Sequence, residues 1–160
     1  ARVEGPVFLR IGRYKVPSVS DGRSPAFAPG VAQVLRDGRD VAIVANGTMV
    51  TVALAAADQL AERGVQARVL NMATVHPLDR EALLDAARST RGVVTVEESV
   101  PRGGLGGAVA ELLAEEHPVR MRLMGTHEFA VTGDVDYLFD RFELTPTGVA
   151  DAAVALLERV

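Results

Sequence analysis

Cysteine is absent from this chain of 160 residues, and lysine occurs once, at Lys15. Without cysteine the protein can form no disulfide, no thiolate zinc site and no cysteine nucleophile. The sequence also lacks any run of about 18 consecutive apolar residues, the length that indicates a membrane-spanning helix. The lack of cysteine is compatible with a reducing compartment, and we expect a cytoplasmic protein.

A marked excess of one charge is missing too. The chain has 17 basic and 21 acidic residues, a formal net charge of −4, and the two signs are interspersed. Nucleic-acid binding usually requires a clustered basic excess, so nucleic acid is not an expected partner. The hydrophobic share of 48% and the charged share of 24% are ordinary for a soluble globular protein. The length predicts one domain with its own core, which needs neither disulfides nor metals.

The beginning of the chain is organised differently from the rest. Residues 1–5 contain neither an initiator methionine nor the pattern of a signal peptide, so we interpret the start as a cut within a longer chain. Residues 6–11 form a short apolar run that predicts a strand. Residues 12–30 are rich in glycine, proline, serine and charge, a composition that marks a linker. The compact domain is therefore predicted to begin near Val31.

From there, short β-type runs alternate with helical segments. Strands are predicted at 31–36, 41–45, 67–70, 92–96 and 119–124. Helices are predicted at 49–63, 79–89, 108–116, 133–142 and 146–160. This alternation indicates an α/β fold with a mostly parallel sheet covered on both faces. The connection at Asp37-Gly38 is a turn and is too short for a parallel crossover, so the first of these strands must run opposite to the second.

The ends of the predicted helices carry residues that favour caps. Thr48 and Asp79 are candidate N-caps of the first and second helices, and Gly64 is a candidate stop for the first. Thr145 is predicted to cap the last helix, with Pro146 at its first helical position.

Two segments between a strand and a helix have the setting of an anion site. Residues 102–107 read RGGLGG, and free N–H groups beside a helix N-terminus can bind an anion. The spacing is not the G-x-G-x-x-G of a dinucleotide site, however. We favour a tight turn and a close helix–sheet contact as the role of these glycines. Residues 46–48 have the same setting, and helix capping accounts for them.

The titratable side chains lack catalytic or metal-binding spacing. Glu97 and Glu98 end a predicted strand, where successive side chains point to opposite faces, so they do not form an acid–base pair. We expect one of them in the interior or at a subunit contact and the other in solvent. His76 and His117 are interpreted as loop or cap residues, and His127 as a candidate for a polar interface; a metal site is not expected from this spacing.

Several segments, in order along the chain, resemble the C-terminal domain of transketolases. Residues 38–48 read GRDVAIVANGT, similar to the family's G-x-D-V-x-I-x-A-x-G-[ST]. Residues 68–79 read RVLNMATVHPLD, similar to R-V-[IV]-N-[ML]-x-[TF]-[IV]-K-P-L-D. Residues 94–99 read VTVEES and precede GGLG at 103–106, similar to V-[TV]-[VL]-E-E-H and G-G-[LF]-G. Residues 5–13 resemble the end of the preceding pyrimidine-binding domain.

The resemblance continues to the last helix. Phe129 and Gly133 stand where the family has F-[GA]-x-[ST]-G, and residues 144–145 match the G-L-T that precedes the last helix. The match is most similar to the second subunit of split bacterial transketolases. The same domain occurs in 1-deoxyxylulose-5-phosphate synthase and in the β subunits of 2-oxoacid dehydrogenases.

Three parts of the sequence depart from the family pattern. Ser99 stands where histidine is usual, and residues 130–132 read AVT where GES is commoner. Ala73 stands where deoxyxylulose-phosphate synthases tend to have arginine. The substitution at Ala73 weakens the synthase interpretation relative to the transketolase one.

The resemblance implies a fold and a division of the chain. The fold would be a three-layer α/β/α sandwich around a five-stranded, mostly parallel mixed sheet with one antiparallel strand. Residues 1–14 would end the preceding pyrimidine-binding domain, residues 15–30 would be a linker, and residues 31–160 would form the transketolase C-terminal domain.

The resemblance also implies cofactors and a substrate contact. The complete enzyme would use thiamine diphosphate and magnesium, but the family's G-D-G…N motif is absent here, so no catalytic, cofactor-binding or metal-binding residue is expected in this chain. Arg13 best matches the family's arginine that contacts the substrate phosphate, with Arg10 as runner-up. Arginine suits phosphate because its planar fork makes paired hydrogen bonds. The alternative is that both are solvated interdomain residues.

We therefore expect the C-terminal domain of a transketolase, an enzyme that transfers a two-carbon ketol unit between sugar phosphates. The domain would support a homo-oligomer with the remaining transketolase domains or subunit and would not be catalytic alone. One alternative is another thiamine diphosphate enzyme, a 2-oxoacid dehydrogenase β subunit or 1-deoxyxylulose-5-phosphate synthase. A second is a non-catalytic α/β binding module, which the coding sequence upstream of Ala1 would distinguish from the enzyme.

Overall fold

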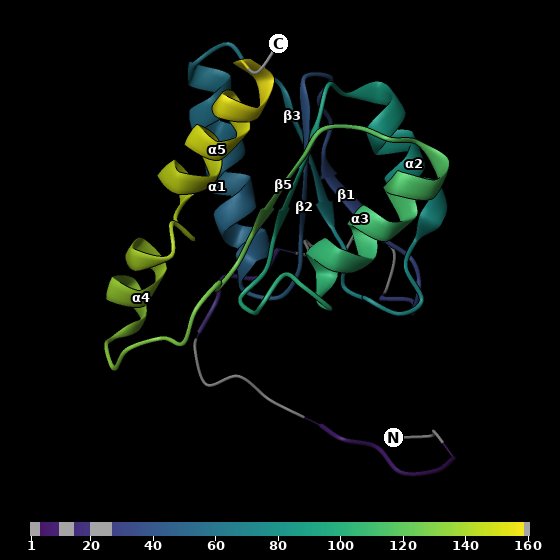
Figure 1. Ribbon diagram of the computed structural model, residues 1–160, viewed down its shortest axis with the longest axis vertical. Coiled ribbons are helices and arrows are strands. Elements are labelled where there is room, and N and C mark those ends of the chain that lie inside the picture. The colour runs from purple at the N-terminus through teal and green to yellow at the C-terminus, as the bar shows by residue number, and fades with distance from the viewer. Residues whose placement is uncertain (1–3, 10–14, 20–26, 159–160) are drawn as a thin grey trace.

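The computed structural model describes residues 4–9, 15–19 and 27–158. Residues 27–158 form an α/β sandwich (Figure 1). The strands are β1 (Gln33–Arg36), β2 (Val41–Ala45), β3 (Ala67–Asn71), β4 (Val93–Val96) and β5 (Met121–Met124). The helices are α1 (Met49–Glu62), α2 (Arg80–Ser89), α3 (Leu105–Glu116), α4 (Val135–Arg141) and α5 (Pro146–Glu158).

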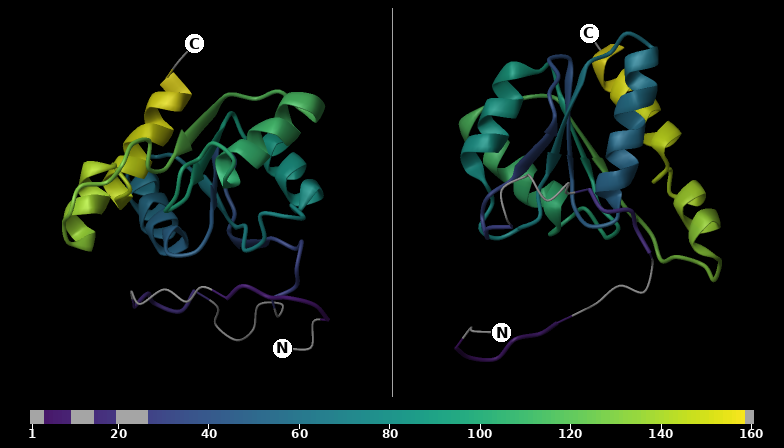
Figure 2. Two further views of the ribbon diagram at one scale, coloured as in Figure 1. Left: turned by 60° about the horizontal axis from the view of Figure 1, so that its bottom comes forward. Right: turned by 180° about the vertical axis from the view of Figure 1, so that it is seen from behind.

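The strands form one mixed sheet in the order β1-β3-β2-β4-β5. β2 pairs in parallel with β3 and β4, and β4 pairs in parallel with β5. β1 is the exception, since it pairs antiparallel with β3. Helices lie on both sides of this sheet (Figure 2). The predicted fold class, a three-layer sandwich around a mostly parallel sheet with one antiparallel strand, is confirmed.

β1 runs opposite to β2, as the short connection at Asp37-Gly38 predicts, but the two strands do not form a hairpin. Both edges of β2 are taken by β3 and β4, so β1 pairs on the far side of β3. Gly38 is required for a close approach, because a side chain there would collide with the backbone of Ala67 at the start of β3. The length of a connection therefore fixes the direction of β1 but not its neighbour.

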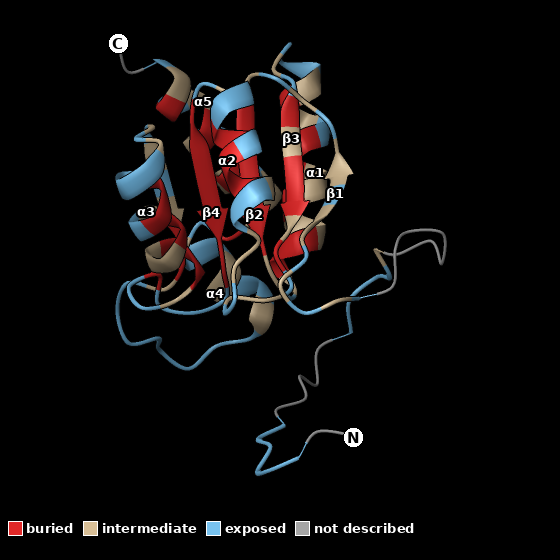
Figure 3. Ribbon diagram, turned by 90° about the vertical axis from the view of Figure 1, so that its right-hand side faces the viewer, coloured by how far each residue is buried: buried red, intermediate tan, exposed pale blue. Residues whose placement is uncertain are grey.

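The helices cover the sheet so that two separate core clusters form. Ile43 and Val69 point toward α1 and α5, whereas Val44 and Leu70 point toward α2 and α3. This alternation follows from the pleat of the strands. All five residues of β2 are buried, as expected for a central strand covered on both faces (Figure 3).

Three of the four predicted helix ends are confirmed. The Asp79 carboxylate accepts a hydrogen bond from an N–H of the first turn of α2 at 3.0 Å. Thr145 does the same for α5 at 3.1 Å, and Gly64 follows α1 with a φ of +78°. Thr48 is at the predicted N-cap position of α1, but its backbone is already helical and its side chain makes no capping hydrogen bond.

Other departures are local. Residues 6–9, the described part of the strand predicted at 6–11, are not in a sheet. α3 begins at Leu105, three residues before its predicted start, because a buried carboxylate serves as acceptor for its first N–H groups. Within residues 4–9, 15–19 and 27–158, no helix combines the length and the apolar character needed to cross a membrane.

Candidate functional site

The carboxyl ends of β2 and β4 form the position where an α/β sheet of this kind would hold a ligand. The chain leaves β2 toward β3 on one side and leaves β4 toward β5 on the other, so these neighbours flank a topological switch point. Open α/β sheets bind ligands in the crevice outside such a point. The segments that lie there are residues 46–48 after β2 and residues 97–99 after β4.

Glu97 fills the anion-binding position at this edge with the chain's own carboxylate. Its side chain is buried, with 2% of its surface exposed. Its two oxygens accept hydrogen bonds from the N–H groups of Leu105 at 3.0 Å and Gly106 at 2.7 Å, in the first turn of α3. The Ser99 hydroxyl lies 2.6 Å from the same carboxylate. A helix N-terminus favours a negative charge, so Glu97 takes the place that an external anion would occupy.

The glycines around Glu97 make this arrangement possible. A Cβ atom at Gly104 would overlap Oε2 of Glu97, and one at Gly106 would lie 2.9 Å from Oγ1 of Thr95. Gly103 has a φ of +78°, which supports the tight turn before α3. The interpretation of these glycines as a tight turn and a close helix–sheet contact is confirmed.

A second carboxylate spans the switch point itself. Oγ1 of Thr48 donates a hydrogen bond of 2.5 Å to Oε2 of Glu98, which joins the loop after β2 to the loop after β4. Thr48 thus acts as a cross-link and not as the predicted cap, and Gly47 makes the turn with a φ of +54°. As expected, one of the two adjacent glutamates is interior and the other, Glu98, is exposed.

The histidines do not converge on a site. His117 is the C-cap of α3, where its N–H donates to the carbonyl of Leu113 at 3.0 Å. His127 lines a small hollow beside Glu128 and Arg141. The Arg141–Glu128 ion pair has a separation of 2.6 Å, and the hydrogen bond that Arg141 donates to the Glu128 carboxylate raises the pKa of Arg141. In the described part of the chain, no group of three or more histidine or carboxylate side chains is placed to hold a metal ion.

Thiamine diphosphate, which the resemblance implies for the complete enzyme, does not fit the residues described. A diphosphate would need the free N–H groups at the start of α3, and these donate to Glu97. The Thr48–Glu98 hydrogen bond spans the crevice between β2 and β4. Arg13 and Arg10, the predicted substrate-binding residues, lie outside the described residues.

A hollow lies away from this edge, beside β5. It has a volume of about 600 Å³ and is formed by β5 together with the α4–α5 segment. Arg122 contributes a positive charge from the strand, and Asp140 and Glu143 contribute negative charges from the end of α4. No local pattern in the sequence points to these residues, because none shows that β5 lies at the edge of the sheet.

These features define a class of α/β domain in which the usual ligand crevice is closed by the chain's own side chains. The model of the family described as "Transketolase, C-terminal domain" matches residues 30–149. The chain belongs to this family, as the sequence resemblance indicates.

Known proteins support the assignment and relate the chain to split transketolases. It is 43% identical over 157 residues to the "6-deoxy-6-sulfo-D-fructose transketolase subunit SqwH" of Clostridium sp. (strain MSTE9), covering 98% of this chain and 48% of that protein. It is 36% identical over 164 residues to a 1-deoxy-D-xylulose-5-phosphate synthase of Desulfitobacterium hafniense (strain DSM 10664 / DCB-2), covering 99% of this chain and 26% of the synthase.

A solved structure agrees over the same extent. The structure titled "Split gene transketolase, inactive beta4 tetramer" superposes with a TM-score of 0.91 at 42% identity, covering 97% of this chain and 51% of that one. The chain thus spans about half the length of the split transketolase subunits it matches.

Proposed function

We propose that this chain is the C-terminal domain of a split transketolase, which in the complete enzyme transfers a two-carbon ketol unit between sugar phosphates. Thiamine diphosphate and magnesium would be held by the other domains. The observation that carries the proposal is the closed carboxyl edge, where Glu97 occupies the helix N-terminus at which this architecture would bind a phosphate. A domain closed in this way serves the enzyme as a scaffold.

The same proposal assigns the parts of the chain. Residues 1–14 end the pyrimidine-binding domain, residues 15–30 are the linker, and residues 31–160 are the scaffold domain. Arg13 contacts the substrate phosphate, with Arg10 as the second candidate. Support comes from the match of residues 30–149 to the family and from the extra length of the split subunits.

The scaffold role means that the domain stabilises an assembly. We assign it two partners, the cofactor-holding transketolase subunit and a second copy of this chain. Support for the first is that a relative at 43% identity is described as a transketolase subunit. Support for the second is that a solved relative at 42% identity is described as a β4 tetramer.

The direct test compares the chain alone with the complete enzyme. Each is supplied with thiamine diphosphate, magnesium, xylulose 5-phosphate and an aldose acceptor. We expect turnover by the complete enzyme and none by the chain alone. Turnover by the isolated chain, or tight saturable binding of thiamine diphosphate to it, would contradict the scaffold role.

A second candidate is 1-deoxy-D-xylulose-5-phosphate synthase, because the chain is 36% identical to such an enzyme over 164 residues. Both matches span nearly the whole of this chain, at 36% identity to the synthase and 43% identity to the transketolase subunit. Replacing both the xylulose 5-phosphate donor and the aldose acceptor with pyruvate and glyceraldehyde 3-phosphate separates the two. A synthase would join the two-carbon unit of pyruvate to the aldehyde and release carbon dioxide, whereas a transketolase would form no product without its ketose donor.

A further inference from the structure

β5 is an edge strand whose outer side is free among the described residues (Figure 1). The carbonyl oxygens of Arg120 and Met124 accept hydrogen bonds from Val93 of β4 and from Glu97, which follows β4. Backbone groups of successive strand residues point in opposite directions, so those of Met121 and Leu123 face outward. A regular, open strand edge is a template for pairing with another chain.

The opposite edge of the sheet is less suited to pairing. β1 shifts its register against β3 between Val34 and Arg36, an irregularity of the kind that blunts sheet edges. Arg36 is also held by Asp58 in an ion pair of 2.5 Å. β5, by contrast, pairs with β4 in unbroken register over all four of its residues. Of the two edges, β5 is therefore the better docking surface.

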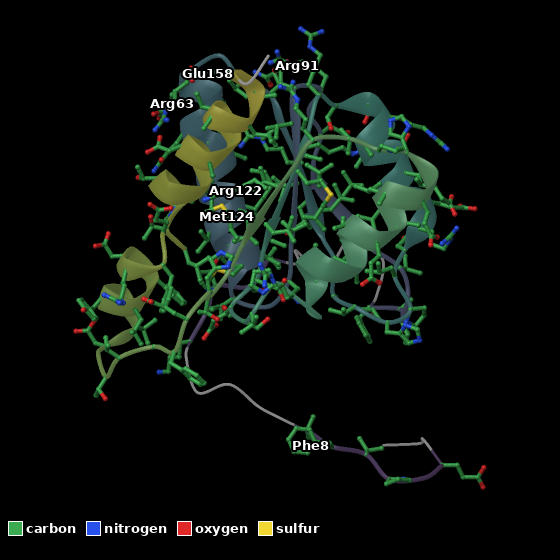
Figure 4. The ribbon with its side chains drawn as sticks, in the orientation of Figure 1. Phe8, Arg63, Arg91, Arg122, Met124 and Glu158 are labelled. Carbon is green, nitrogen blue, oxygen red and sulfur yellow. The ribbon has the colours of Figure 1, made fainter. Side chains whose placement is uncertain are left out.

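A groove runs beside the β5 edge. This is the hollow of about 600 Å³ between β5 and the α4–α5 segment. Its α5 wall presents the small side chains of Ala152 and Ala155, which allow a close approach from outside. Arg122 lies on the α5 side of β5 (Figure 4). Asp140 and Glu143 stand at the α4 end of the groove.

The charges in this groove are complementary but do not pair within the chain. Among the described residues, Arg122, Asp140 and Glu143 take part in none of the ion pairs. Asp151, the other acid of the groove, is instead paired with Arg63 at 2.5 Å. The groove therefore presents one free cation and two free anions that a partner with the same three groups would match.

We infer that two copies of this chain dock against each other along their β5 edges, each with Arg122 against the Asp140 and Glu143 of the other. A twofold contact is isologous, so one patch must carry both members of every pair. The groove meets this requirement, because its strand side is basic and its helix side is acidic. The inference rests on the proposed scaffold role and names the surface through which two copies associate.

Charge reversal tests this arrangement in the chain and in the complete subunit. Arg122→Glu and Glu143→Arg are each measured alone and as an equimolar mixture, by sedimentation velocity and native mass spectrometry. Each variant alone places like charges opposite one another twice in the symmetric contact, and its dimer dissociation constant should rise by about 10-fold or more. In the mixture one contact keeps the unchanged Arg122, Asp140 and Glu143, and the other again has opposite charges at positions 122 and 143, so heterodimers should form in preference to either homodimer.

Arg39→Glu is the matched control, since Arg39 is exposed on the turn between β1 and β2. It makes the same change in net charge and should leave the dimer unchanged. Thermal unfolding of each variant checks that the fold is kept. Failure of the mixture to form heterodimers, an equal effect of Arg39→Glu, or a chain that stays monomeric would each overturn the inference. If the complete enzyme is active and Arg122→Glu leaves its assembly unchanged, the β5 edge is not the contact surface. The scaffold role would not be affected by that result.

Discussion

Glu97 and Gly104 are in contact so close that position 104 has room for a hydrogen atom only. A methyl group there would overlap Oε2 of Glu97 and would also lie 2.8 Å from the carbonyl oxygen of Val100. Gly104→Ala should therefore destabilise the domain by about 2 kcal/mol, as measured by urea unfolding. In a Glu97→Ala background the cost of Gly104→Ala should fall, because one of the two clashes is gone. An unchanged cost there would show that the Glu97 contact does not limit position 104.

Removal of the Glu97 carboxylate should open an anion site. Glu97→Ala leaves the N–H groups of Leu105 and Gly106 without their acceptor, and we expect a loss of about 3 kcal/mol in the free energy of unfolding. Formate should restore part of that stability in a saturable way, because it binds the folded state only. Sodium chloride at equal ionic strength controls for screening. Stabilisation of the unchanged chain by formate to the same degree would argue against a specific site.

Thr95 has a buried hydroxyl that pairs with none of the described residues. It is fully buried in β4, and its Oγ1 has no hydrogen bond to any described residue. Replacing it with the isosteric valine removes an unpaired polar group, so Thr95→Val should stabilise the domain by up to about 1 kcal/mol. Thr95→Ser keeps the hydroxyl and deletes the methyl group, and it should destabilise. Thermal unfolding of Thr95→Val and Thr95→Ser measures the two effects. Destabilisation by Thr95→Val would show that the hydroxyl has a partner, such as a water molecule.

Asp79 joins two parts of the fold. One oxygen caps α2, and the other accepts the N–H of Ala32 at 2.8 Å, just before β1. Asp79→Ala should cost about 2 kcal/mol in urea unfolding, because two backbone donors lose their acceptor. The control is Asp85→Ala, which breaks an ion pair of 2.7 Å with Arg68 at an exposed carboxylate and should cost under about 1 kcal/mol. Equal costs would mean that Asp79 acts only as a surface charge.

The phosphate contact is tested in the complete enzyme. Arg13→Ala should raise the KM for phosphorylated substrates more than for unphosphorylated ones, because the lost hydrogen bonds go to the phosphate. Arg10→Ala provides the comparison and should have the smaller effect. If Arg13→Ala affects both substrate types alike, Arg13 does not contact the phosphate.

Much of the fold could be predicted because its signals are local. The β-branched run at 41–45 identified the central strand, and Asp79 and Thr145 marked the helix starts that the structure contains. These patterns act over a few residues, through the pleat of a strand or the free N–H groups of a helix end. The closed site could not be predicted in the same way. Thr48 was expected as a cap, and its actual partner, Glu98, lies 50 positions away in the sequence.

The sequence by itself determined the α/β class, the direction of β1, the family and the glycine-dependent turn before α3. Only the tertiary structure decided that β1 lies outside β3, that Glu97 occupies the helix N-terminus, and that Arg122 lies with Asp140 and Glu143 in one groove beside β5. The physical reason is the distance along the sequence over which each signal acts. Propensity and periodicity act between near neighbours, whereas strand order and the partner of a buried carboxylate depend on segments that meet only when the sheet has formed.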